Sequence, residues 1–135
     1  LDHIEAGKSM MIYNKLGLDK LNCCVAIIKN ARSNKMGKKD IIKIEADIDL
    51  VDLDALGFID HNITVNIIKN GEIVEKKTLK LPKSITNVIK CQNPRCITSI
   101  EQELDNIFIL TDEEKQVYRC KYCEEKYTRQ NRHID

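Results

Sequence analysis

Four of the six cysteines in this chain stand in two close pairs, and their spacing limits what the second half can fold into. Cys91 and Cys96 enclose four residues, Cys120 and Cys123 enclose two, and 23 residues separate the pairs. Two short loops that each present two thiolates can surround one Zn²⁺ tetrahedrally, with bonds of about 2.3 Å. The spacing therefore predicts a structural zinc site that stabilises a segment too small to bury a sufficient core alone. Disulfides and an iron–sulfur cluster are the alternatives.

The composition is that of a folded protein rather than of a disordered or fibrous one. Hydrophobic residues make up 42% of the 135 residues and charged residues 32%. No apolar run approaches the roughly 18 residues of a membrane span, and no charged start leads into a signal-like apolar core. We therefore expect a cytoplasmic protein without a membrane partner. The opening "LDHI" is typical of the end of a strand, so we expect a further segment before it.

A change of pattern near Pro82 predicts two domains. Upstream, the sequence alternates between helical and strand patterns, whereas the paired cysteines all lie downstream. Pro82 supplies no backbone donor and favours an extended conformation at Leu81. We place the boundary within 80–88, with residues 1–83 as one domain and residues 84–135 as a small all-β zinc-binding domain.

The first domain is expected to contain a helix over about residues 6–16. Ala6, Met10 and Tyr13 share helical spacing, and Gly17 is a natural C-terminal stop. Methionine at such spacing usually fills core, so we interpret Met10 in this way rather than as a cofactor contact.

Two strands are expected after this helix. "LNCCVAIIK" is typical of a strand buried on both faces, with Cys23 and Cys24 as core thiols. "KDIIKIEA" predicts a second strand with two different faces. Ile42 and Ile44 share one of these faces, and Lys39, Ile41 and Lys43 share the other.

A second helix and a hairpin complete the first domain. Asp49 is the expected N-cap of a helix through about Phe58. Asn70-Gly71 between two β-rich runs predicts the two-residue turn of a hairpin. With a strand at the N-terminus, this order predicts an α+β fold: a ferredoxin-like antiparallel sheet with two helices on one face. The residues expected to point inward from the second helix are Leu50, Leu53 and Leu56.

No catalytic constellation is evident in the sequence. His3, His61 and His133 are far apart, and no phosphate-binding loop motif occurs. A net charge of +1 argues against a broad basic surface for nucleic acid. Two alternatives are still open, namely an enzyme that works with another chain and a zinc-ribbon protein that binds nucleic acid. In the latter, the residues on phosphates would be Lys121, Lys126, Arg129 and Arg132.

Several segments, in order, resemble the regulatory chain of aspartate carbamoyltransferase over almost the whole sequence. They are "LDHI", "KMGKKDIIKIE", "TVNIIKNGEIVEKKTLKLP", "NVIKCQNPRCIT" and "RCKYCEEKY". The resemblance implies an N-terminal allosteric domain that binds CTP, ATP and in some members UTP, and a C-terminal zinc domain that docks on catalytic chains. It also implies that two regulatory chains pair through their allosteric domains and that the chain itself catalyses nothing.

The resemblance further implies which residues hold the nucleotide. Asp2 matches the position at the ribose, His3 the one that reaches the phosphates, Lys43 the lysine near base and ribose, and Lys39 the lysine further along that strand. A triphosphate carries about four negative charges, so several cations must replace its hydration. Gly71 stands where some members have an aromatic residue. The residues that match the triphosphate end are Asn66, Ile73 and Lys76.

Overall fold

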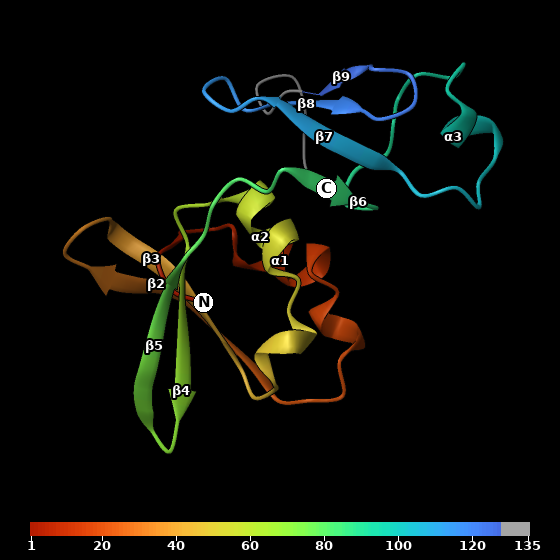
Figure 1. The fold of residues 1–135 in the computed structure, drawn as a ribbon. Helices are drawn as coiled ribbons and strands as arrows, with labels where there is room; N and C mark the ends of the chain where they lie inside the picture. The colour runs from red at the N-terminus through yellow and green to blue at the C-terminus, as the bar shows by residue number, and fades with distance from the viewer. Residues whose placement is uncertain (128–135) are drawn as a thin grey trace. The chain divides into compact units, whose positions relative to one another are not determined.

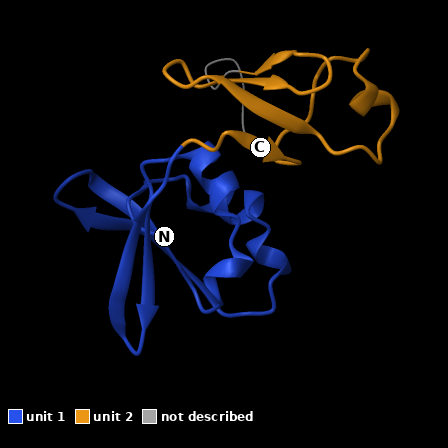
Figure 2. Ribbon diagram, in the orientation of Figure 1, with its two compact units in different colours: residues 1–80, 135 blue, residues 81–134 orange. Residues whose placement is uncertain are grey.

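A computed structural model describes residues 1–127, which form two compact units (Figure 2). Unit 1 covers residues 1–80, and unit 2 begins at Leu81. In the described part of the chain, no helix is long and apolar enough to cross a membrane. Unit 1 contains β1 (Ile4–Glu5), α1 (Ser9–Lys15), η1 (Leu18–Lys20), β2 (Val25–Ser33), β3 (Gly37–Ile44), η2 (Ile48–Leu50), α2 (Leu53–Ile59), β4 (Thr64–Lys69) and β5 (Glu72–Thr78).

The strands of unit 1 form two antiparallel groups that meet at the N-terminal segment. One group has the order β1-β3-β2, and the other is the β4-β5 hairpin. Asp2 exchanges backbone hydrogen bonds with Thr64, at 2.8 and 2.9 Å. Residues 1–5 therefore lie between β3 and β4, which gives the order β2-β3-β1-β4-β5. This confirms the ferredoxin-like prediction, with β5 added as the hairpin partner, and α1 and α2 lie on one side of the strands (Figure 1).

The first helix ends as the sequence predicts but starts later and presents a different face. Gly17 adopts a left-handed φ of 65° directly after the C-cap, which confirms it as the stop. The helix begins at Ser9 because Gly7, at a φ of 94°, interrupts the helical path. Ile12 is fully buried whereas Met10 is 47% exposed, so the prediction that Met10 fills core is wrong.

The second helix is split. A short 3-10 turn, η2, precedes an extended Val51, and α2 then starts with Asp52 as its N-cap. The Asp52 carboxylate accepts the Ala55 N–H at 3.1 Å. The predicted single helix capped by Asp49 is therefore wrong. Leu56 is buried as predicted, but Leu50 is 56% exposed, because it belongs to η2.

Strand β2 begins at Val25, after the adjacent Cys23 and Cys24. Cys24 is exposed and Cys23 is partly exposed, so the prediction of two core thiols is wrong. The prediction that this strand is buried on both faces is wrong as well, since its residues alternate between partly and fully exposed at the start. β2 is an outer strand of its group and pairs only with β3 among the described strands, so it has fewer neighbours to cover its side chains than a central strand has.

The hairpin of β4 and β5 matches its prediction. Asn70 and Gly71 both have positive φ, 53° and 79°, as the two-residue turn requires. The register places Asn66 opposite Lys76 and Ile68 opposite Ile73, with an irregularity between Ile67 and Ile68.

Unit 2 is a small antiparallel sheet with the strand order β6-β7-β8-β9. Its centre contains Phe108 and Tyr127, whose rings meet edge-on with centroids 6.3 Å apart. The buried Tyr118 hydroxyl donates to the carbonyl oxygen of Pro82 at 2.6 Å. One short helix, which the sequence analysis did not predict, follows the first cysteine pair. The elements are β6 (Ser84–Thr86), α3 (Ile97–Ile100), β7 (Ile107–Asp112), β8 (Val117–Cys120) and β9 (Lys126–Tyr127).

Candidate functional site

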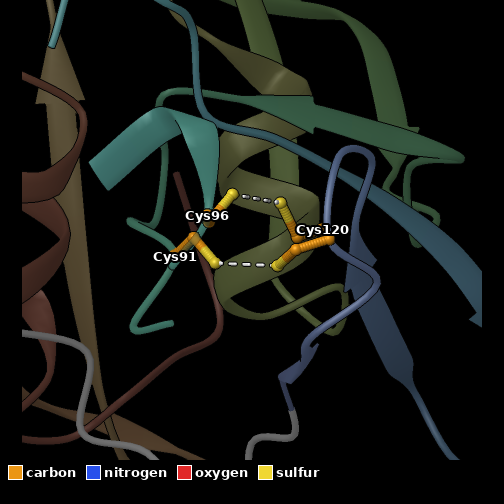
Figure 3. Close-up of side chains that lie close together, drawn as sticks. Cys91, Cys96 and Cys120 are labelled. Carbon is orange, nitrogen blue, oxygen red and sulfur yellow. Dashed lines mark hydrogen bonds between the residues drawn. The ribbon is translucent and has the colours of Figure 1, made fainter. Parts of the chain in front are cut away.

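The four paired cysteines converge in unit 2. All four sulfur atoms lie within 4.8 Å of one another. The sulfurs of Cys91 and Cys123 are 3.4 Å apart, and those of Cys96 and Cys120, which point toward each other in Figure 3, are 3.7 Å apart. A tetrahedron with metal–sulfur bonds of about 2.3 Å has edges of about 3.8 Å. The cluster therefore fits one tetrahedral metal ion. All six cysteines are free thiols, so the disulfide alternative is not realised.

Backbone hydrogen bonds hold the two cysteine loops in place. The Cys91 N–H donates to the side-chain oxygen of Asn106 at 3.1 Å, which ties the first loop to the start of β7. The Cys96 N–H donates to the Asn93 carbonyl at 3.0 Å and closes that loop. Cys120 ends β8, and its carbonyl accepts the N–H of Glu124, whose φ is 63°. Sequence reasoning missed Asn106, because a loop asparagine 15 residues from its partner leaves no local signal.

The thiols differ in how readily they lose a proton. Burial alone would raise the pKa of Cys96, but hydrogen bonds from Thr98 and from the neighbouring thiols lower it to about 7. Burial raises the pKa of Cys91 and of Cys120. Several buried thiolates side by side need a cation to neutralise them, so the cluster is suited to a metal ion rather than to four ionised thiols alone.

In unit 1, the residues singled out for nucleotide binding gather on one face of the sheet. Lys39 Nζ lies 2.9 Å from an oxygen of Asp2, so these two side chains point the same way. Lys43 shares that face of β3, since residues four apart on a strand point alike. Thr64 pairs with Asp2, and Asn66 follows two residues later on the same face of β4. Lys76 and Ile73 lie opposite Asn66 and Ile68, which completes the face.

A cavity of about 590 Å³ opens on this part of unit 1. Asp2, Lys43 and Asn66 line it, together with Ile41 and Ile68, which the sequence analysis did not single out for the site. Four candidates do not line the cavity, but each is next to a residue that does. His3 follows Asp2 in the chain, and Lys39 forms an ion pair with Asp2. Ile73 and Lys76 are the hairpin partners of Ile68 and Asn66.

The polar groups around the cavity are unevenly satisfied. The Asn66 side-chain oxygen is buried and has no hydrogen-bond partner among the described residues. His3, at a φ of 59°, places its Nδ1 3.0 Å from the Thr64 hydroxyl. Burial would raise the pKa of Asp2, but hydrogen bonds from Lys39 and from the His3 backbone lower it. Asp2 is therefore a carboxylate at neutral pH. The side-chain oxygen of Asn66 has no hydrogen-bond donor among the described residues, and a bound ligand could supply one.

The nucleic-acid alternative finds little support in the described residues. Lys121 and Lys126 are exposed, while Arg129 and Arg132 lie outside the described residues. Glu124 and Glu125 lie between these two lysines in the sequence, so the local charge is mixed rather than uniformly basic.

Comparison with known proteins places both units in one family. A family model described as the allosteric domain of the aspartate carbamoyltransferase regulatory chain matches residues 1–80, and one described as its metal-binding domain matches residues 83–133. A regulatory chain of that enzyme from Clostridium botulinum is 56% identical over 128 residues, covering 95% of this chain and 87% of the relative. Those from Clostridium tetani and Bifidobacterium longum are 51% and 45% identical, covering 94% and 93% of this chain and 88% and 90% of the relatives. The chain belongs to the family of aspartate carbamoyltransferase regulatory chains, the non-catalytic subunits of a pyrimidine-pathway enzyme.

Proposed function

We propose that this chain senses nucleotides in unit 1 and passes their effect to catalytic chains through a zinc-holding unit 2. Residues 1–83 form the nucleotide-binding allosteric domain, and residues 84–135 form the zinc-binding domain that docks on a catalytic chain. The effectors are CTP and ATP, with UTP as a third candidate. Two regulatory chains pair through their allosteric domains, and the assembly works in the cytoplasm.

The observation that carries this proposal is the common sheet face of the candidate nucleotide residues. Lys39, Lys43 and Lys76 bring three positive charges to this face. Its acidic residues are Asp2, which pairs with Lys39, and Glu5, which the register places opposite Lys39, and Glu45 lines the neighbouring cavity. A triphosphate of about four negative charges needs such a set of cations to replace its hydration. The neighbouring cavity, at about 590 Å³, has the size of a typical small-molecule site.

The proposed roles follow from the chemistry of each side chain. The Asp2 carboxylate accepts hydrogen bonds from ribose hydroxyls, and its ion pair with Lys39 fixes its position. Lys43 acts near base and ribose, while His3 reaches toward the phosphates. The Asn66 amide offers an oxygen or, after a half-turn, an N–H group to the ligand. The residues proposed at the triphosphate end are Asn66, Ile73 and Lys76. Asn66 and Lys76 are opposite each other in the hairpin, and Ile73 is opposite Ile68.

The proposed metal is Zn²⁺, because four thiolates in a closed tetrahedral set are typical of structural zinc sites. The ligands are Cys91, Cys96, Cys120 and Cys123. Such a site leaves no position open for substrate, so its role is to hold the fold of the docking domain. Regulation then requires two states of the assembly, and each nucleotide acts only through its different affinity for them.

Calorimetric titration of the zinc-loaded chain with CTP, ATP, UTP and GTP, at two salt concentrations, tests the nucleotide proposal. We expect saturable binding that discriminates between nucleotides and weakens at least tenfold in Lys76→Ala. Lys77→Ala is the matched control, because adjacent residues of β5 point to opposite faces. Absence of binding at millimolar nucleotide, or equal losses in the two variants, would contradict the proposed site.

A further inference from the structure

We propose that the metal centre opens from one side, with Cys91 and Cys123 released first, and that the Thr98 hydroxyl keeps Cys96 as the last ligand. This inference rests on the proposed filling of the four-cysteine site by Zn²⁺. It concerns the order in which the four cysteines release the ion, and the identity of the ion does not determine that order. Thr98 is a positioning residue in this account, since it acts through a sulfur and not on the metal.

The four ligands differ in their exposure to solvent. Cys96 and Cys120 are 2% and 1% exposed. Cys91 is 9% exposed, and Cys123 is partly exposed. A competing chelator or a thiol reagent must approach from solvent, so it meets the Cys91–Cys123 edge of the tetrahedron before the Cys96–Cys120 edge.

Thr98 adds a second difference between these edges. Its hydroxyl oxygen lies 3.1 Å from the Cys96 sulfur, and the residue is only 7% exposed. A metal-bound thiolate carries no proton, so the hydroxyl must be the donor in this hydrogen bond. A donated hydrogen bond spreads the negative charge of a thiolate and fixes its orientation toward the metal. Thr98 thus contacts a cluster sulfur from outside the cluster, through its side chain.

The fold explains why Thr98 can do this for Cys96 alone. Cys96 is the residue directly before α3, and the N–H of Ser99 donates to the Cys96 carbonyl at 2.9 Å. This first turn places the side chain of Thr98, two residues after Cys96, next to the Cys96 sulfur. The Cys91 N–H is instead held by Asn106, and the Cys91 sulfur accepts a hydrogen bond from the backbone of Asn93 rather than from a hydroxyl.

The test is a pulse-labelling experiment on the full zinc-loaded chain. A chelator removes the metal slowly while short pulses of N-ethylmaleimide trap freed thiols, and peptide mass spectrometry assigns the labelled cysteines. Cys23 and Cys24 lie outside the cluster and serve as internal standards for a thiol without metal. We expect Cys123 and Cys91 to be labelled first and Cys96 last.

Variants of Thr98 distinguish the effect of its hydroxyl group from the effect of its buried side-chain volume. Thr98→Val keeps the shape but removes the donor, so we expect about tenfold faster zinc release and earlier labelling of Cys96. Thr98→Ser retains the donor and should stay within about twofold of the parent. Thr86→Val is the matched control. Thr86 is exposed on β6, and its hydroxyl has no hydrogen-bond partner among the described residues.

Simultaneous labelling of all four cysteines, or labelling of Cys96 before Cys91 and Cys123, would overturn the inference. Equal release rates in Thr98→Val and Thr98→Ser would overturn the role of the hydroxyl. The labelling order of the parent chain needs no variant, so it decides even if Thr98→Val fails to fold. The zinc content before chelation tests the underlying proposal separately. One ion per chain supports it, and a chain that holds no zinc overturns both.

Discussion

The carboxylate of Asp40, a fully buried residue of β3, accepts the backbone N–H of Asn30 at 2.9 Å. Asn30 has a φ of 59° and lies in the irregularity of β2 between Ile28 and Ala31. The other carboxylate oxygen accepts the N–H groups of Gly7, at 3.1 Å, and of Ser9, at 3.4 Å. One side chain therefore joins the bulge of an outer strand to the start of α1.

Replacing this carboxylate should cost unit 1 much of its stability. We expect Asp40→Asn to lower the free energy of unfolding by about 2–3 kcal/mol, because the amide has one acceptor oxygen and leaves buried N–H groups unpaired. Chemical denaturation followed by circular dichroism measures this. Glu45→Gln, at an exposed position just beyond the same strand, should change the stability by less than about 0.5 kcal/mol. Equal effects of the two changes would contradict the structural role given to Asp40.

The same carboxylate should make unit 1 sensitive to acid. Burial alone would raise the pKa of Asp40, but the hydrogen bonds from Ser9, Asn30 and Gly7 outweigh it and lower the pKa. A lowered folded-state pKa means that the stabilisation is complete above the unfolded value of about 3.9 and is lost as pH falls through the folded value. Unfolding measured between neutral pH and acid should therefore show a weaker loss of stability in Asp40→Asn than in the parent. A parallel loss in both proteins would count against this assignment.

The N-cap of α2 offers a comparison between neighbouring aspartates. Asp52→Ala should destabilise unit 1 by about 1 kcal/mol, because the Ala55 N–H loses its acceptor. Asp49→Ala should have little effect, since the side chain of Asp49 makes none of the hydrogen bonds of the described residues. Thermal unfolding of the two variants distinguishes them, and the reverse order would favour the helix start that the sequence predicted.

Removal of the metal should unfold unit 2 and leave unit 1 intact. Four converging thiols hold two loops and the end of β8, and a sheet of this size has little core to replace them. Hydrogen exchange of the chelated chain should show lost protection over residues 84–127 and retained protection over residues 25–78. Nucleotide binding should persist while the proposed joining to catalytic chains is lost. Chelated protein that still joins catalytic chains would contradict the docking role proposed for unit 2.

Local signals in the sequence predicted local structure well. The Asn70-Gly71 turn and the Gly17 stop each depend on a few neighbouring residues, and the structure confirms both. The two close cysteine pairs predicted one metal site, and the four sulfurs do converge. The ferredoxin-like order followed from the sequence of elements. The hairpin register then brought Asn66 beside Lys76, ten residues later.

The failures have non-local causes. Cys24 is exposed and lies just before β2, an outer strand that pairs only with β3 among the described strands, and the apolar run in the sequence indicated neither where the strand starts nor that it lies at the edge. Asp49 and Asp52, three positions apart, both suit the start of a helix. Val51, which lies between them, has an extended backbone, so the helix starts after Asp52. Asp40 appeared only as a polar residue in an apolar strand, because its partners are backbone groups up to 33 residues away.

The pairing of Asp2 with Thr64 has a mechanical consequence for unit 1. Two backbone hydrogen bonds are the ladder contacts through which the β1-β3-β2 group meets the β4-β5 hairpin in the described chain. The proposed ligand face crosses this seam, with Lys43 on one side and Lys76 on the other. A polyanion bound to both lysines would link the two strand groups across these two hydrogen bonds, so ligand binding would reduce the motion of one group relative to the other.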